Sequence, residues 1–86
     1  MAPETIQKHL LHQPFRPFRV FLSDGAVYDV RQPEMVLVTQ RDVIIGLPRP
    51  SERFPKRIAY CDLLHITRIE PITGDRDNPE EASRSQ

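Results

Sequence analysis

The chain contains no tryptophan, a single cysteine and only three glycines, and its twelve basic residues are balanced by twelve acidic ones. One cysteine cannot form an internal disulfide, so a chain this short depends on its hydrophobic core or on association with copies of itself. Three widely separated glycines cannot build a phosphate-binding glycine loop. Zero net charge removes the global positive field that many nucleic-acid-binding proteins use.

Long apolar runs are also missing. Only 38% of the 86 residues are hydrophobic, the mean hydropathy is −0.48, and no run approaches the roughly 20 apolar residues of a membrane span. The first fifteen residues show no basic start followed by a long apolar stretch, so no secretory signal is visible. We expect one small cytoplasmic domain that has no membrane partner.

Nine prolines, about twice the usual share of roughly 5%, separate the apolar segments. Pro3 and Glu4 favour a helix start, and Ile6, Leu10 and Leu11 place apolar groups on one side. This pattern predicts a short helix over residues 3–13. The prolines that follow predict an extended connector over residues 14–18.

Residues 18–22 and 26–31 alternate around Ser23-Asp24-Gly25, which predicts a β-hairpin. A three-residue loop with Gly25 in the left-handed conformation keeps apolar residues opposite one another, whereas a two-residue loop mixes charge into the apolar face. The longer loop therefore predicts these cross-strand pairs: Leu22–Ala26, Phe21–Val27, Val20–Tyr28, Arg19–Asp29 and Phe18–Val30.

A second hairpin is predicted from residues 35–39 and 43–47, joined by residues 40–42. Both faces of these strands are apolar, with Met35 and Leu37 on one side and Val36 and Val38 on the other. Burial on one face does not account for this pattern. Either the amino-terminal helix or a neighbouring subunit covers the outer face.

The remaining segments complete a mainly β domain over residues 1–71. Three prolines predict an irregular loop over residues 48–55, followed by a strand over 56–61, a helical turn over 62–64 capped by Asp62, and a last strand over 65–70. Residues 72–86 are polar and lack aromatics, which predicts a disordered tail. The order of elements predicts a small bent β-barrel of five to six strands with a short N-terminal helix.

Three strings, PFRPFRVFLSDG, VYDVRQPEMVLV and YCDLLHITRIEP, resemble a family of short bacterial proteins that largely lack an assigned function. That family has a Pro-Phe-x-Pro-Phe start, an Asp-Gly hairpin, a Pro-Glu segment and an Asp-Leu-Leu closing strand. The similarity covers roughly residues 5 to 71. Each motif has a structural explanation, so the resemblance implies family membership and little chemistry.

The order of elements also resembles the Sm-like and Src-homology-3-like (SH3-like) small barrels, in which a helical turn precedes the final strand. Sm-like RNA binders build a nucleotide pocket from an Asp-x-x-x-Asn-type segment and a later Gly-containing basic segment. The nearest stretches here, residues 29–36 and 60–62, lack that Asn and Gly. The resemblance is therefore one of architecture.

Cys61 and His65 stand four residues apart, and His9 and His12 stand three apart. These spacings lack the repeated close cysteine pairs that are typical of zinc sites. A nucleophile–base pair of Cys61 and His65 would further need a substrate cleft and oxyanion donors, which no segment predicts. We expect a buried thiol and surface histidines, with no metal, cofactor, small-molecule substrate or catalytic residue.

Basic residues gather in one loop around an aromatic residue. This combination suits a phosphate backbone with a stacked base, and Arg also suits protein interfaces. The candidate partner-binding residues are Arg41, Arg49, Arg53, Phe54, Lys56 and Arg57.

Two functions are compatible with these observations. The first is a non-enzymatic interaction module, acting as a protein adaptor or homo-oligomeric scaffold through exposed strand surfaces and this basic loop. The second is RNA or single-stranded DNA binding through the same loop, by a ring or a monomer.

Overall fold

The computed structural model describes residues 1–72, and the tail predicted from residue 72 onward lies, apart from Ile72, outside the described residues. The first hairpin joins β1 (Phe18–Leu22) to β2 (Val27–Val30). Gly25 has a φ of 94°, which is the left-handed conformation that glycine adopts without strain. The predicted three-residue loop and its register are confirmed by the strand pairs Phe18–Val30, Arg19–Asp29, Val20–Tyr28 and Phe21–Val27 and by the bond from the Leu22 N–H to the Ala26 carbonyl.

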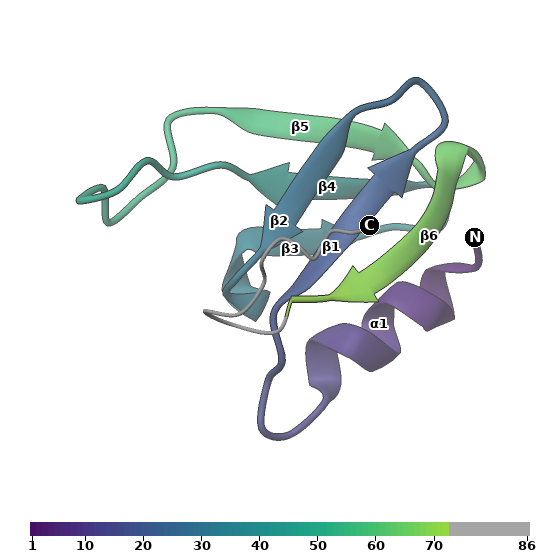
Figure 1. Ribbon diagram of the computed structural model, residues 1–86, viewed down its shortest axis with the longest axis horizontal. Helices are drawn as coiled ribbons and strands as arrows, with labels where there is room; N and C mark the ends of the chain where they lie inside the picture. Colours follow the sequence, from purple (N-terminus) through teal and green to yellow (C-terminus); the bar gives the residue numbers. More distant parts are fainter. Residues whose placement is uncertain (73–86) are drawn as a thin grey trace.

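The last strand, β6 (Ile66–Pro71), pairs with the other edge of β1 and completes an antiparallel sheet in the order β2-β1-β6 (Figure 1). A single turn of 3-10 helix, η2 (Leu63–His65), leads into β6. The Asp62 carboxylate accepts a hydrogen bond of 2.9 Å from the Leu64 N–H. The predicted cap is therefore confirmed, although the turn lies one residue later than predicted.

The second sheet contains β3 (Val36–Val38), β4 (Asp42–Gly46) and β5 (Ile58–Asp62) in the order β3-β4-β5. Its first two strands form the predicted second hairpin, in which β3 is shorter than predicted and β4 has the predicted length but begins one residue earlier. The turn closes one residue early because the Thr39 hydroxyl accepts a 2.8 Å bond from the Asp42 N–H, so β4 begins at Asp42. A 3-10 turn, η1 (Pro33–Met35), joins the two sheets.

The helix α1 (Pro3–Leu11) ends two residues before the predicted limit. His12 is extended, with ψ of 135°, and Pro14 disfavours helical backbone at Gln13. Ile6 is buried, but Leu11 is 66% exposed. At about 100° per residue, Leu11 lies roughly 140° around the helix from Ile6, so the prediction that both share the apolar side was wrong.

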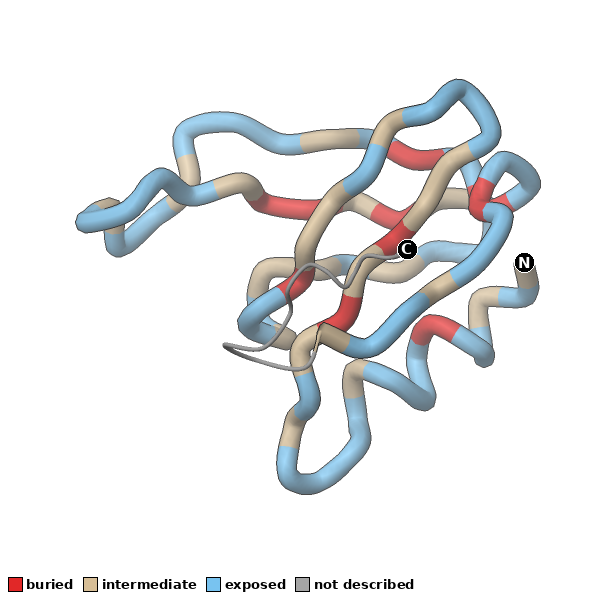
Figure 2. The backbone as a smooth tube through the Cα atoms, in the orientation of Figure 1, coloured by how far each residue is buried: buried red, intermediate tan, exposed pale blue. Residues whose placement is uncertain are grey.

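One core lies between the helix and the inner faces of both sheets (Figure 2). Its buried residues alternate along the strands, as strand geometry requires. They are Ile6, Phe18, Val20, Val30, Val43, Ile45, Cys61, Leu63 and Ile66. Both sheets therefore contribute to the same hydrophobic cluster.

The mainly β class is confirmed, but a closed barrel is not. Strand pairing within residues 1–72 forms two separate three-stranded antiparallel sheets. The bond from the Leu63 N–H to the Arg41 carbonyl extends the pairing of β4 with β5 inside the second sheet. No helix within these residues is long and apolar enough to cross a membrane.

Within residues 1–72, the outer face of the second sheet stays uncovered. Leu37, Ile44 and Tyr60 lie side by side across β3, β4 and β5. Leu37 is 60% exposed and Tyr60 is 71% exposed. Helix α1 inserts Ile6 into the core and leaves both residues open to solvent, so the helix is not the cover that the two-sided pattern requires.

Candidate binding cleft

A cleft of about 840 Å³ separates β2 from the chain that follows β4. One wall comes from β1 and β2, and the other comes from the end of β4 and the loop over residues 47–57, here called the arginine loop. Four of the lining side chains are arginines, two from each wall: Arg19, Arg31, Arg49 and Arg57. The apolar lining includes Tyr28, Met35 and two prolines.

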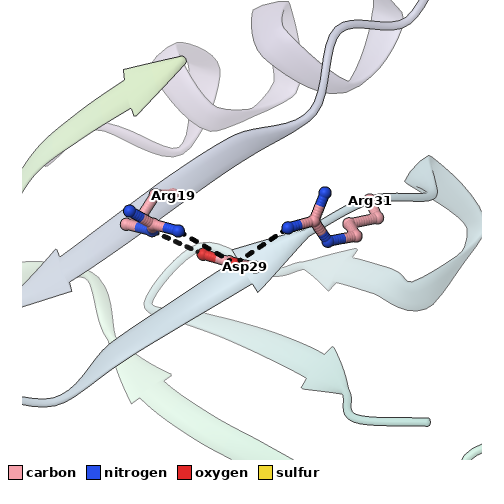
Figure 3. A network of polar contacts seen from close by, with 3 residues as sticks. All are labelled: Arg19, Asp29 and Arg31. Carbon is pink, nitrogen blue, oxygen red and sulfur yellow. Dashed lines mark hydrogen bonds and ion pairs between the residues drawn. The ribbon is translucent and has the colours of Figure 1, made fainter. Parts of the chain in front are cut away.

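The strand wall is organised by one carboxylate between two guanidinium groups (Figure 3). Arg19 Nε donates to Asp29 Oδ1 at 2.7 Å and its Nη2 donates to Oδ2 at 3.2 Å. Arg31 Nη2 lies 3.4 Å from the same Oδ2. Arg19 and Asp29 are directly opposite in the strand register, which fixes their geometry. One negative charge thus faces two positive charges.

The loop wall is held by hydrogen bonds within the arginine loop. At its base, the Leu47 N–H donates to the Arg57 carbonyl at 2.9 Å, and Arg57 Nη2 donates back to the Leu47 carbonyl at 3.1 Å. At its tip, the Arg49 N–H donates to Glu52 Oε1 at 2.8 Å. These bonds close the loop on itself and hold Arg49 and Arg57 beside the cleft.

Gly46 sets how closely the loop approaches β4. A Cβ atom at this position would lie 2.9 Å from Pro55 Cγ and 3.3 Å from Met35 Sδ. Any larger residue would push Pro55 and the loop away. The absence of a side chain at Gly46 therefore shapes the cleft.

The cleft carries a surplus of positive charge, because four guanidinium groups line it against the carboxylates of Asp29 and Glu52. The Glu52 carboxylate is engaged with a backbone N–H. Guanidinium groups bind carboxylates and phosphates through paired N–H donors. The arrangement is suited to an anionic ligand.

The structure brings together only part of the predicted site. Arg49 and Arg57 line the cleft, whereas Arg53, Phe54 and Lys56 lie on the arginine loop outside its lining. Phe54 is 73% exposed, and the Arg53 guanidinium carbon lies 5.7 Å from the centroid of its ring.

Arg41 does not belong with this group. It precedes β4, and the arginine loop follows β4. The five residues of β4 separate the two by about 17 Å at 3.4 Å per residue. Arg41 therefore lies at the other end of β4 from the arginine loop and outside the lining of the cleft.

Arg19, Asp29, Arg31 and Tyr28 were not predicted as site residues. Their spacing is that of ordinary strand alternation, which hides any further role. Their place beside the arginine loop depends on how the two sheets pack. An Arg–Asp–Arg set on paired strands is the one signal that could have marked them.

Cys61 and His65 do not form a nucleophile–base arrangement. Cys61 is buried, and burial raises the pKa of its thiol, with the Asp24 carboxylate raising it further. The exposed His65 ring instead lies with Nδ1 3.1 Å from the Ser23 hydroxyl. A thiol with a raised pKa is a poor nucleophile at neutral pH.

Comparison of the chain with protein-family models, with curated proteins and with solved structures finds no match.

Proposed function

We propose that this protein is a non-enzymatic interaction module that binds an acidic segment of a partner protein in the cleft between β2 and the arginine loop. The observation that carries the proposal is the set of four arginines, two from each wall, around a cleft of about 840 Å³. A cleft of this size accommodates several side chains of an extended peptide.

The lining favours a peptide over a nucleic acid. Tyr28 is the one aromatic residue among the described lining residues, whereas proteins that bind single strands offer several aromatic platforms for bases. Apolar groups such as Met35 and Pro48 instead suit the aliphatic parts of a peptide. Partner carboxylates then pair with the guanidinium groups of Arg31 and Arg49.

The fold assignment belongs to the same proposal. We infer that the two sheets are the halves of a small bent barrel of the Sm-like and SH3-like kind, within the family of short bacterial proteins described above. The order of elements supports this, because η2 lies directly before the closing strand β6. Barrels of this kind commonly serve as binding scaffolds, which is consistent with an interaction module.

The test is a titration of a fluorescently labelled Glu-rich peptide, followed by anisotropy. We expect saturable binding that the double variant Arg31→Gln/Arg49→Gln weakens by about a hundredfold or more, because it removes two charge-assisted bonds of roughly 1.5–3 kcal/mol each. Arg41→Gln/Lys8→Gln is the matched control, since it also removes two positive charges, at the far end of β4 and on α1, and should leave binding unchanged. Equal losses in both variants would contradict the proposal.

A second candidate is single-stranded nucleic-acid binding along the arginine loop. The exposed Phe54 ring beside Arg53 favours it, because such a pair can stack on a base. Binding of a labelled oligonucleotide should then fall steeply with salt and should be weakened by Phe54→Ala. An oligonucleotide that outcompetes the acidic peptide in a salt-dependent manner would favour this candidate over the first.

A further inference from the structure

Strand β5 (Ile58–Asp62) has one unpaired edge. Within the described residues it pairs only with β4, and it forms the outer strand of its sheet (Figure 1). Backbone hydrogen bonds join Leu47 to Arg57 and Leu63 to Arg41. They show which residue pairs of the β4–β5 ladder are hydrogen-bonded and which are not. The backbone groups of Ala59 and Cys61 therefore point at β4, and those of Ile58, Tyr60 and Asp62 point outward.

The side chains beside this free edge are unusually apolar for an exposed position. Ile58 is 54% exposed and Tyr60 is 71% exposed, both on the outer face of the sheet. Beyond the two ends of the strand, Phe54 is 73% exposed and Leu64 is 85% exposed. Edge strands are ordinarily protected by charge, proline or a covering segment, so an apolar open edge indicates an interface.

The sequence of the edge is complementary to itself when two copies run antiparallel. If Ala59 lies on the two-fold axis, Ile58 faces Tyr60 of the second copy and Lys56 faces its Asp62. Ile58, Tyr60 and Asp62 have backbone groups that point outward, as a hydrogen-bonded ladder requires, and Lys56 lies two residues before the strand begins. The register one step further, centred on Tyr60, instead places Ile58 against Asp62. Apolar and charge matching thus select the first register.

A second observation favours the same register. Asp42 and Asp62 lie directly opposite each other in the β4–β5 ladder. Like charges at this spacing destabilise a sheet. No ion pair joins either carboxylate to a basic residue in the described part of the chain. Lys56 of a second copy would supply the missing positive charge beside Asp62.

We propose that the protein forms a symmetric dimer in which the β5 edges of two copies pair antiparallel about Ala59. The β3-β4-β5 sheets of the two copies join into one continuous sheet, and each Ile58 packs against Tyr60 of the other copy. This two-fold contact is isologous and closes on itself. It adjoins the arginine loop, but the paired side chains lie outside the lining of the cleft, and it does not depend on the proposed function.

The first test is light scattering with size-exclusion chromatography on the full chain over a wide dilution series. We expect a dimer of twice the 10.0 kDa chain mass that dissociates on dilution. Lys56→Glu replaces two attractive pairs by two repulsive ones and should raise the dissociation constant about tenfold. Lys8→Glu is the matched control, because it makes the same charge change on α1 and should have no effect.

Adding Asp62→Asn to Lys56→Glu should restore part of the lost affinity. Asparagine removes the repelling charge and keeps an acceptor oxygen for the Leu64 N–H. Circular dichroism on each variant checks that it folds. A dimer that responds equally to Lys56→Glu and Lys8→Glu would overturn the register, and a monomer at every concentration would overturn the proposal.

Cross-linking gives an independent test of the register. In this register, Ala59 of one copy lies opposite Ala59 of the other. The two form a pair without hydrogen bonds, in which the Cα atoms are about 4.5 Å apart, within the range that a disulfide spans. Ala59→Cys should therefore form a covalent dimer with oxidised glutathione, whereas Tyr60→Cys and the natural chain should not. Cross-linking of Tyr60→Cys in preference to Ala59→Cys would contradict the proposed register.

Discussion

The two sheets share one core but differ on their outer faces. On the β2-β1-β6 sheet, charged side chains satisfy one another: Arg19 pairs with Asp29, and Arg68 Nε lies 2.8 Å from Glu70. The Arg68 guanidinium also covers the Phe21 ring at 3.8 Å from its centroid. On the β3-β4-β5 sheet, the corresponding row is Leu37, Ile44 and Tyr60.

This difference shows which surfaces are complete within one chain. A face with paired charges and a covered aromatic ring gains little from the burial of apolar surface, whereas an exposed apolar row gains free energy when another surface removes it from water. The β3-β4-β5 sheet is accordingly the one for which we propose self-pairing. The cleft lies at the edge of the other sheet, where the ion pairs of Asp29 with Arg19 and Arg31 face the arginine loop.

The largest expected effect concerns the shared core. Phe18→Ala should lower the free energy of unfolding by about 3–5 kcal/mol, because it removes a buried ring and leaves a cavity between the sheets. Urea denaturation measures the loss. Ile45→Ala, in the other sheet, should cost a similar amount, about 2–5 kcal/mol, since both side chains belong to one cluster. A negligible cost for either variant would mean that the sheets do not share a core.

A smaller loss is expected at the turn of the first hairpin. Gly25→Val should cost about 1 kcal/mol or more, because a β-branched residue resists the left-handed backbone at φ 94°. Space is not the reason, since a Cβ at this position meets no atom within 4 Å. Gly25→Asn serves as the control and should cost less. Equal melting temperatures for the natural chain and the valine variant would contradict this turn.

Changes of charge should affect stability on the outer face of the β2-β1-β6 sheet but hardly on that of the β3-β4-β5 sheet. A double-mutant cycle of Arg19→Ala and Asp29→Ala should give a coupling of about 0.2–1 kcal/mol, the range for partly exposed ion pairs. In the isolated chain, Leu37→Lys should change stability by less than about 0.5 kcal/mol, because its side chain is already exposed. A large destabilisation by Leu37→Lys at concentrations where the protein is monomeric would break the contrast between the faces.

The smallest effect at neutral pH concerns Cys61. Burial raises the pKa of its thiol, so the folded state keeps the proton to higher pH than the unfolded state does. The associated stability is therefore fully present below the unfolded pKa of about 8.5 and is lost as the pH rises through the folded pKa. Urea denaturation in alkaline buffers should show a steeper decline for the natural chain than for Cys61→Ala. Parallel curves would contradict the raised pKa.

Local pattern predicted much of the fold. Alternation around Gly25 determined the register of the first hairpin, because only one loop length keeps Phe18 and Val20 on an apolar face. Asp62 was recognised as a cap from its place before an apolar pair. Closure into a barrel was not confirmed, because it depends on pairing between distant strands, which no local pattern contains.

The candidate site was only partly predictable. The arginine loop was visible as a cluster in sequence, and Arg49 and Arg57 do line the cleft. Arg31 and Asp29 were missed because they look like ordinary strand residues until the sheets pack. Closeness in sequence grouped Arg41 with the arginine loop, whereas the structure places strand β4 between them.

The most direct test of the central claim is an NMR titration of the full chain with an unlabelled Glu-rich peptide, observing backbone amides and arginine Nε–H groups. We expect the largest shifts at Arg31, Arg49 and Arg57, on both walls of the cleft. We expect none at Arg41, beyond the other end of β4. Shifts confined to Tyr60 and the rest of the β5 outer face, or no shifts at all, would contradict an anion-binding cleft.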